Sequence, residues 1–325
     1  MKYRKLGNTG LKVSSLCLGT MTFGDGADKS TSKEIYSLSR DKGVNFFDCA
    51  NVYAGGESER ILGELIRDER DQVIISTKAY FPTTEDINGN GLSRFHLTKE
   101  LEKSLKRLDT EYVDIYFLHA FDKNTPLEES LSTLNDFVRQ GKVLYVGLSN
   151  FAAWQVVKAI SVTERFGFSP ISCIQPMYNL LKRQCESEIL PMAKSEGLGV
   201  VSYSPLAGGL LTGKYIVGNN VKGRFKTNEM YQRRYKGESN AKTIKRFMEF
   251  CDDDSYDPAS LAIGWVNSHP DITSPIIGAR NTEQLKPALA SVELIITSEL
   301  RKKIAGFSPS PALATDRAEE LRDEK

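Results

Sequence analysis

The stretch GVNFFDCANVY, residues 43–53, decides the predicted fold. Its first half is short, apolar and rich in residues that favour strands, and it ends at the carboxylate Asp48. Beyond Tyr53, the break Ala54-Gly55-Gly56 precedes residues 57–67, whose apolar side chains recur at helical spacing. Asp48 and Tyr53 therefore share one predicted strand-to-helix loop. Where strands alternate with helices, such loops gather on the face of the sheet that binds ligands.

The same alternation of a buried strand and an amphipathic helix recurs along the chain. The predicted strands are 15–20, 44–48, 73–78, 113–119, 143–149, 171–175, 199–204 and 272–276, and the helices after them are 32–42, 57–67, 98–108, 127–140, 152–166, 185–196, 257–268 and 282–290. Helix signals include Thr98 and Asp257 as N-caps and glycines 141 and 197 just past helix ends.

Eight such units in 325 residues predict an α/β protein with a (β/α)₈ barrel, formed by residues 1–325 as a single domain. Residues 1–14 alternate polar with apolar around Gly7-Asn8, which predicts a hairpin before the first unit. An open, doubly wound sheet is the alternative. It is disfavoured because GTMTFGDG, after the first strand, lacks the GxGxxG turn that opens directly into a helix.

Two segments interrupt the alternation and one polar segment ends the chain. Residues 81–94 follow the third predicted strand, and residues 205–256 follow the seventh. Loops of that length inside a compact domain are usually functional, so we expect both to cover the mouth of a site. The tail, residues 308–325, is polar and interrupted by proline, which is typical of a surface segment.

Composition excludes several classes of function. Lys and Arg number 43 against 42 Asp and Glu, so the net charge of +1 gives no overall field for nucleic acid. No apolar run approaches the roughly 20 residues that span a bilayer, and the first residues lack the apolar core of a secretion signal, so we expect a cytoplasmic protein with no membrane partner. The five cysteines form no CxxC pair, which predicts reduced, packed thiols, no disulfide framework and no metal site.

Ionisable side chains end three successive predicted strands. They are Asp48, Lys78 and His119, and Tyr53 lies in the loop after the first of these strands. Each alone has an ordinary structural interpretation, such as a packed tyrosine, a hydrogen-bonded histidine or a buried ion pair. Burying these side chains together at one end of a barrel costs free energy unless they have partners or a function. They therefore form the candidate catalytic group.

These four residue types suit protonation of an oxygen while a carbon is reduced. A tyrosine hydroxyl in a model peptide has a pKa of about 10. The nearby ammonium of Lys78 would lower the pKa of Tyr53. Asp48 would hold Lys78 protonated, and His119 would hydrogen-bond a substrate carbonyl oxygen. Because no side chain delivers hydride, such a site must also hold a reduced nicotinamide.

Residues 2–291 resemble the aldo-keto reductase superfamily, particularly its branch of bacterial oxidoreductases and the similar potassium-channel β subunits. The motifs that carry the resemblance are RKLGNTGLKVSSLCLGTMTFG, NFFDCANVYAGGESERILGELI, GKVLYVGLSNF, QPMYNLL, YSPLAGGLLTGKY and PIIGARNTEQL, in that order along the chain. The resemblance implies that Asp48, Tyr53 and Lys78, with His119, are the catalytic tetrad. It further implies that Tyr53 donates a proton to a small-molecule carbonyl substrate, with NADPH as the usual hydride source.

The same resemblance implies a cofactor site. Ser149, Asn150 and Gln175 would bind the nicotinamide carboxamide, Tyr203 would stack on its ring, and Thr20 would also contact the cofactor. The loop of Ser204, Pro205, Leu206, Gly208 and Gly209 would follow the pyrophosphate, with Lys214 and Arg224 reaching over the phosphates. Gly278, Arg280 and Gln284 would hold the adenosine end, where Arg280 favours a 2′-phosphate; a solvated surface arginine is the alternative for Arg280.

One departure from the resemblance concerns Pro287-Ala288, where relatives often carry Glu-Asn against the adenine. NADH therefore stays open beside NADPH. A catalytically weak, NADPH-binding regulatory subunit of the channel-β type is the alternative function, because those proteins retain the same tetrad. The sequence does not define the particular carbonyl substrate or an oligomeric partner.

Overall fold

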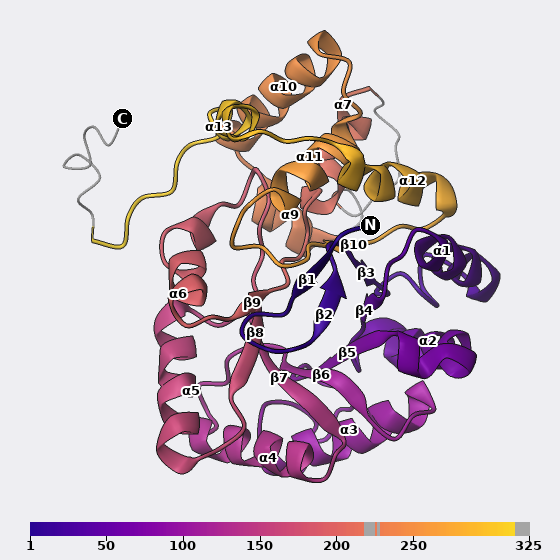
Figure 1. Cartoon of the computed structure of the whole chain (residues 1–325), viewed down its shortest axis with the longest axis vertical. Coiled ribbons are helices and arrows are strands. Elements are labelled where there is room, and N and C mark those ends of the chain that lie inside the picture. The colour runs from indigo at the N-terminus through magenta and orange to yellow at the C-terminus, as the bar shows by residue number, and fades with distance from the viewer. Residues whose placement is uncertain (218–224, 226–227, 316–325) are drawn as a thin grey trace.

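A computed structural model describes residues 1–217, 225 and 228–315, and in it eight strands form one sheet in which each strand pairs in parallel with its neighbours. The strands are β3 (Cys17–Gly19), β4 (Phe46–Asp48), β5 (Ile74–Ala79), β6 (Val113–Leu118), β7 (Val143–Ser149), β8 (Ile171–Gln175), β9 (Gly199–Val200) and β10 (Ile276–Ile277). Backbone hydrogen bonds from Ile276 to Ser202 (2.7 Å) and from Thr273 to Val200 (2.9 Å) connect the last strand to the seventh. The sheet therefore curls into the predicted (β/α)₈ barrel (Figure 1).

Helices follow the strands and surround the sheet (Figure 1). They are α1 (Lys29–Asp41), α2 (Glu57–Ile66), α3 (Arg94–Leu108), α4 (Leu127–Arg139), α5 (Ala153–Phe166), α6 (Ile189–Ser195), α11 (Pro258–Asn267) and α12 (Thr282–Ala290). Asp257 caps α11 as predicted, because its side chain accepts a hydrogen bond from the Ser260 amide. The predicted cap at Thr98 is wrong: α3 begins one turn earlier, where Ser93 accepts a hydrogen bond from the His96 amide.

The predicted hairpin is confirmed and lies against the N-terminal end of the barrel. Strands β1 (Tyr3–Lys5) and β2 (Lys12–Ser14) pair antiparallel, and the Asn8 amide between them donates to the Gly197 carbonyl just before β9. Leu6 and Val13 pack into the apolar cluster that fills the barrel interior. The hairpin thus covers the end of the barrel opposite the C-terminal ends of the strands.

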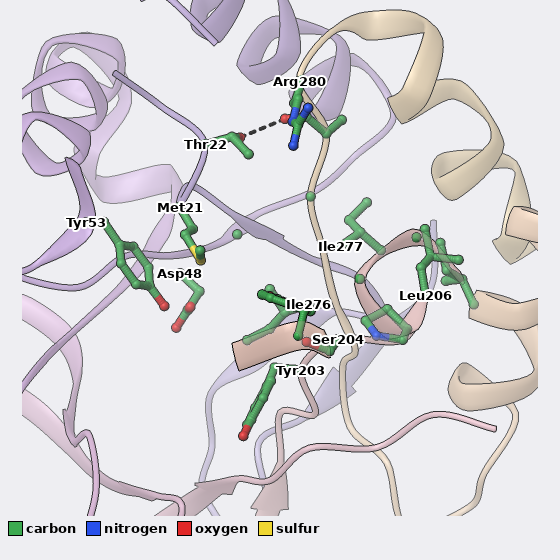
Figure 2. A pocket seen from close by; sticks show the side chains of 18 of the residues that line it. Met21, Thr22, Asp48, Tyr53, Tyr203, Ser204, Leu206, Ile276, Ile277 and Arg280 are labelled. Atoms are coloured by element: carbon green, nitrogen blue, oxygen red, sulfur yellow. Dashed lines mark hydrogen bonds between the residues drawn. The ribbon is translucent and has the colours of Figure 1, made fainter. Parts of the chain in front are cut away.

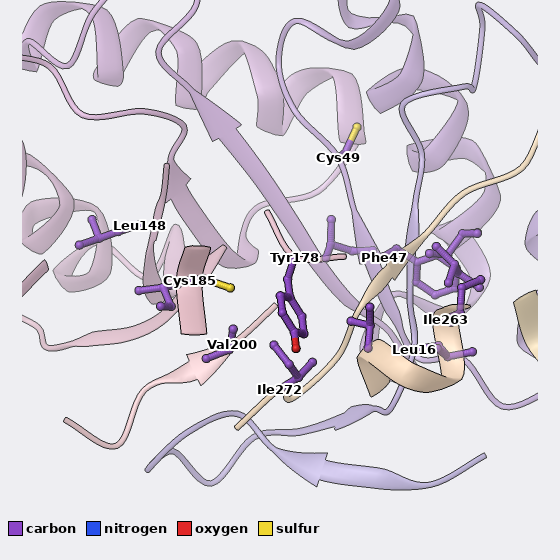
Figure 3. Close-up of a cluster of buried hydrophobic side chains, with 14 of the residues drawn as sticks. Leu16, Phe47, Cys49, Leu148, Tyr178, Cys185, Val200, Ile263 and Ile272 are labelled. Atoms are coloured by element: carbon purple, nitrogen blue, oxygen red, sulfur yellow. The ribbon is translucent and has the colours of Figure 1, made fainter. Parts of the chain in front are cut away.

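Strand alternation divides the apolar core into two parts. Phe46 belongs to the cluster inside the barrel, whereas the next residue, Phe47, belongs to the larger cluster between sheet and helices, which also contains Val200 and Ile263 (Figure 3). Successive strand residues face opposite sides of a sheet, and the same rule places Asp48 and Lys78, which lie in β4 and β5. All five cysteines are free and buried, as predicted.

The two predicted interruptions differ in structure. Residues 80–93 form a loop without a helix, whereas the segment after β9 contains η4 (Ala207–Thr212), α7 (Lys214–Val217), α9 (Glu229–Tyr235) and α10 (Glu238–Asp253). Helix α13 (Ser298–Ala305) then precedes the tail, of which residues 308–315 are described. Within the described ranges, none of the helices combines the length and apolar character that a bilayer crossing requires.

Helix α2 approaches α3 closely at Gly63. A Cβ atom at this position would lie 2.5 Å from the carbonyl oxygen of Leu108, so α2 would have to move. We expect Gly63→Ala to lower the free energy of unfolding by about 1–3 kcal/mol, as other overpacked cores do, although alanine is the better helix former. Urea denaturation measures this change. Gly10→Ala is the matched control, since nothing lies within 4 Å of its Cβ position; an equal loss in both variants would contradict the close-packing explanation.

Candidate active site

A cavity of about 720 Å³ opens at the C-terminal end of the barrel strands (Figure 2). Tyr53 and Asp48 lie on one side of it and Arg280, at the end of β10, lies on another. Both long segments contribute to its walls: Phe81 comes from the loop after β5, and Pro205, Leu206, Gly208, Gly209, Thr212, Lys214, Met230, Tyr231 and Arg234 come from the segment after β9. This is the position in which barrels of this kind bind ligands.

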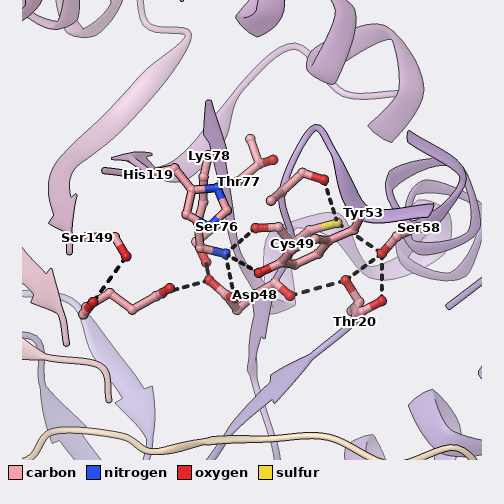
Figure 4. Close-up of polar contacts among 12 residues, drawn as sticks. Thr20, Asp48, Cys49, Tyr53, Ser58, Ser76, Thr77, Lys78, His119 and Ser149 are labelled. Carbon is pink, nitrogen blue, oxygen red and sulfur yellow. Dashed lines mark hydrogen bonds and ion pairs between the residues drawn. The ribbon is translucent and has the colours of Figure 1, made fainter. Parts of the chain in front are cut away.

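Asp48 and Lys78 form a buried ion pair beneath this cavity (Figure 4). The Lys78 Nζ donates to Asp48 Oδ2 over 2.6 Å and to the carbonyl oxygen of Cys49, and it lies 3.5 Å from the Tyr53 hydroxyl. Burial alone would lower the pKa of Lys78, but the negative charge of Asp48 and these contacts raise it above its ordinary value. Lys78 is therefore a permanent cation directly behind the tyrosine.

Tyr53 is held in a tight turn between β4 and α2. Ala54, Gly55 and Gly56 all have positive φ, at 48°, 63° and 94°, which glycine adopts readily and alanine rarely. Burial raises the pKa of Tyr53 to about 12, although the charge of Lys78 lowers it. The expectation that Lys78 leaves this phenol more acidic than usual is therefore wrong for the protein alone, because desolvation outweighs the cation.

His119 follows β6 and forms part of the cavity wall. Its ring centroid lies 6.2 Å from that of Tyr53 and 4.9 Å from that of Phe81, edge-on to both. Burial, together with the charge of Lys78, holds the pKa of His119 well below its ordinary value, so the ring is neutral. Its Nδ1 is buried with no hydrogen-bond partner among the described residues, which leaves Nε2 as the nitrogen that can reach a ligand.

Two further side chains donate hydrogen bonds to the other carboxylate oxygen of Asp48, Oδ1, and hold it in place. Ser76 Oγ and Gln175 Nε2 donate to Asp48 Oδ1 over 2.7 Å and 3.0 Å. Sequence analysis missed Ser76, although a signal exists: it lies two residues before Lys78 in the same strand and so faces the same side. The contact from Gln175 connects the ion pair to the predicted carboxamide site.

The predicted carboxamide-binding residues form one hydrogen-bonded group beside His119. Tyr203 OH donates to Asn150 Oδ1 over 2.6 Å, and Asn150 Nδ2 donates to the carbonyl oxygen of His119 over 2.9 Å. Ser149 Oγ donates to the carbonyl oxygen of Gln175 over 3.1 Å. Amide groups and one phenol ring therefore converge at the histidine end of the cavity.

The other end of the cavity combines an exposed backbone with basic side chains. In the loop after β9, Ser204, Ala207, Gly208 and Gly209 all have positive φ, between 50° and 91°. Gly209 suits this loop because its φ of 91° is one that other residues rarely adopt, whereas a Cβ there would meet only the movable end of the Lys214 side chain, at 2.8 Å. Such turns and helix N-termini suit phosphate groups, and α12 begins beside Arg280.

Most of the predicted site residues line this cavity. They are Asp48, Tyr53, His119, Ser149, Asn150, Gln175, Tyr203, Ser204, Pro205, Leu206, Gly208, Gly209, Lys214, Gly278, Arg280 and Gln284. Lys78 and Thr20 lie behind the wall; the Thr20 hydroxyl donates to the carbonyl oxygen of Asp48 over 3.1 Å. Arg224 lies outside the described residues.

Further lining residues escaped sequence analysis. Met21, Thr22 and Val52 lie in the loops after β3 and β4, and their positions next to predicted site residues could have identified them. Tyr231 and Arg234 come from α9. No strand end precedes them, so only the folded arrangement places them in the wall.

The residues present fit a nicotinamide dinucleotide. Amides and a neutral histidine lie at one end, and a positive-φ loop with Lys214 and Arg280 lies at the other. The cavity volume falls within the range of about 300–1,000 Å³ that is common for ligand and cofactor sites. A ligand with an amide at one end and phosphates at the other matches this division.

Comparisons with known proteins agree with this arrangement. The model of the Aldo/keto reductase family matches residues 15–308. The uncharacterized oxidoreductase YrpG of Bacillus subtilis is 38 % identical over 329 residues, covering 98 % of this chain and 99 % of that protein. A probable voltage-gated potassium channel subunit beta of Oryza sativa is 36 % identical, covering 97 % and 99 %, and a putative aryl-alcohol dehydrogenase of Schizosaccharomyces pombe is 34 % identical, covering 91 % and 93 %.

Proposed function

Because the chain belongs to the aldo/keto reductase family, we propose that it is an NADPH-dependent oxidoreductase that reduces an aldehyde or ketone to an alcohol. The observation that carries this proposal is the position of the Tyr53 hydroxyl, 3.5 Å from the Lys78 ammonium and at the wall of the cavity that His119 also lines. A bound reduced nicotinamide would supply the hydride.

Proton transfer is the task of the protein in this proposal. With a pKa of about 12, Tyr53 is protonated at neutral pH and can give its proton to the carbonyl oxygen as hydride reaches the carbon. Lys78 stabilises the phenolate that forms on Tyr53. The neutral His119 donates a hydrogen bond to the carbonyl oxygen of the substrate. The product is the alcohol, and the phenolate recovers a proton from water.

The cofactor would lie along the cavity. Ser149, Asn150 and Gln175 would hold the carboxamide; only the Oε1 of Gln175 is left for it, because Nε2 donates to Asp48. Tyr203 would contact the nicotinamide ring, and the loop of residues 204–209 would follow the pyrophosphate. The Asp48–Gln175 hydrogen bond thus couples cofactor position to the ion pair that supports Tyr53.

A direct test mixes the purified protein with NADPH and a panel of aldehydes and ketones. Loss of the reduced-nicotinamide absorbance, with one alcohol formed per NADPH consumed, would support the proposal. Tight cofactor binding without turnover of any carbonyl would reject it.

That second outcome would favour a regulatory subunit that binds NADPH. The specific observation behind this alternative is the rice relative, described as a probable channel subunit beta, which matches nearly the full length of the chain. A channel partner would then bind the protein.

Arg280 offers a prediction about cofactor choice. We expect Arg280→Gln to weaken NADPH binding by about 10- to 100-fold, which is the usual contribution of a hydrogen bond to a charged group. The dissociation constant for NADH should change by less than about twofold, because NADH has no 2′-phosphate. Fluorescence quenching gives both dissociation constants. Lys286→Gln, in the helix α12 that follows Arg280, is the matched control, because that exposed lysine pairs with Glu283. Equal weakening for both cofactors would contradict a contact with the 2′-phosphate.

A further inference from the structure

We propose that Glu100 is a positioning residue that joins the loop carrying Tyr53 to the loop carrying Phe81, and so keeps the proton donor aligned with the substrate wall. This inference rests on the proposed function for its catalytic consequence. The hydrogen-bonded junction itself is a property of the fold.

Glu100 is a charged residue placed where charges are rarely found. It lies in α3 and only 1 % of its surface is exposed. Lys103 Nζ donates to Glu100 Oε1 over 2.8 Å. Burial alone would raise the pKa of Glu100, but hydrogen bonds from Lys103, Asn51 and Thr83 hold it below its ordinary value, so the side chain is a carboxylate. Two of these three donors come from loops at the cavity.

The first arm of the junction reaches the tyrosine loop. Asn51 Nδ2 donates to Glu100 Oε2 over 2.8 Å, and both side chains are buried. The backbone amide of Asn51 donates to the carbonyl oxygen of Lys78 over 3.1 Å. Asn51 lies between Asp48 and Tyr53 in the sequence. It is hydrogen-bonded both to the carboxylate of Glu100 and to β5, the strand that bears Lys78.

The second arm reaches the loop after β5. Thr83 Oγ1 donates to Glu100 Oε1 over 3.0 Å, two residues beyond Phe81. The Phe81 ring lines the cavity edge-on to His119, and 41 % of its surface is exposed. The base of this loop is closed separately by a hydrogen bond from the Gly91 amide to the Tyr80 carbonyl oxygen. Glu100 therefore restrains the part of the loop that directly follows Phe81.

One buried carboxylate accepting from two loops makes their positions interdependent. A shift of about 1 Å in a catalytic group can lower a rate by about 100-fold, so small changes at this junction matter. Neither Asn51 nor Thr83 needs to touch the substrate for this effect. The role differs from simple helix stabilisation, because Lys103 alone could neutralise Glu100.

The experiment compares Glu100→Gln with Glu102→Gln. Glu102 lies on the same helix, is about half exposed and pairs with Lys142, so the control removes the same charge without touching either loop. For Glu100→Gln we expect hydrogen–deuterium exchange to rise in residues 49–56 and 80–93 but not in α11, and kcat/KM to fall roughly tenfold. The dissociation constant for NADPH should stay unchanged.

Two further variants separate the arms. Thr83→Val should raise KM for bulky aldehydes and leave kcat unchanged, whereas Asn51→Ala should lower kcat with little effect on KM. The proposed role of Glu100 would be overturned if hydrogen–deuterium exchange rose only in α3. Equal changes in exchange and in kcat/KM for Glu100→Gln and Glu102→Gln would overturn it too. If no carbonyl is turned over, the exchange data still decide whether Glu100 joins the loops, so failure of the proposed function remains distinguishable.

Discussion

Replacement of Tyr53 by phenylalanine should lower kcat for carbonyl reduction by about 10²- to 10⁴-fold, the usual contribution of a positioned general acid. The change removes one hydroxyl, the group that lies 3.5 Å from Lys78 at the cavity wall. The ring itself is retained, so packing against His119 should persist. NADPH binding, measured by fluorescence quenching, should change less than about twofold because no cofactor contact is removed.

Tyr112→Phe is the matched control for this experiment. Its hydroxyl also contacts a charged side chain, donating to Asp71 Oδ1 over 3.4 Å, but this contact is exposed and Tyr112 does not line the cavity. We expect this variant to keep wild-type activity. If Tyr53→Phe retained most of its activity, another group would have to supply the proton, and the mechanism proposed for Tyr53 would be rejected.

Replacement of Lys78 by methionine should destabilise the protein by about 3–5 kcal/mol, because it leaves the carboxylate of Asp48 buried without its counter-ion. Lys78 is fully buried, and its ammonium is 2.6 Å from Asp48 Oδ2. The hydrogen bonds from Ser76 and Gln175 to Asp48 Oδ1 would remain but carry no positive charge. Urea denaturation measures the loss, and carbonyl reduction should also disappear because the phenolate of Tyr53 would lack its cation.

The double variant Asp48→Asn/Lys78→Met distinguishes an unpaired charge from a packing defect. Removing both charges should restore a substantial part of the lost stability without restoring activity. Arg67→Met is a control for loss of an exposed pair, since more than half of each partner in the Arg67–Asp109 pair is exposed, and we expect less than about 1 kcal/mol. A double variant as unstable as Lys78→Met alone would contradict the ion-pair explanation.

Much of the fold could be predicted because it depends on local patterns. Apolar strands of predictable length, glycines past helix ends and the Asp257-Pro258 cap led to a (β/α)₈ barrel with an N-terminal hairpin, and the structure has both. Errors arose where two local signals competed. Ser93 and Thr98 are both acceptable caps, and the structure uses the earlier one, where the amides on either side of Ser93 also donate to distant side chains, Leu92 to Asp122 and Arg94 to Glu129.

The sequence by itself determined that Asp48, Lys78 and His119 meet at one end of the barrel, because strand period and strand order fix where strand-end residues lie, and that Tyr53 is near them, because it lies only five residues after Asp48. Only the tertiary structure decided the balance of burial against charge that raises the pKa of Tyr53, and the buried Glu100 that joins two loops. The reason is physical: spacing along the chain sets the direction of a side chain, whereas its pKa and hydrogen-bond partners depend on groups brought near it by distant parts of the chain.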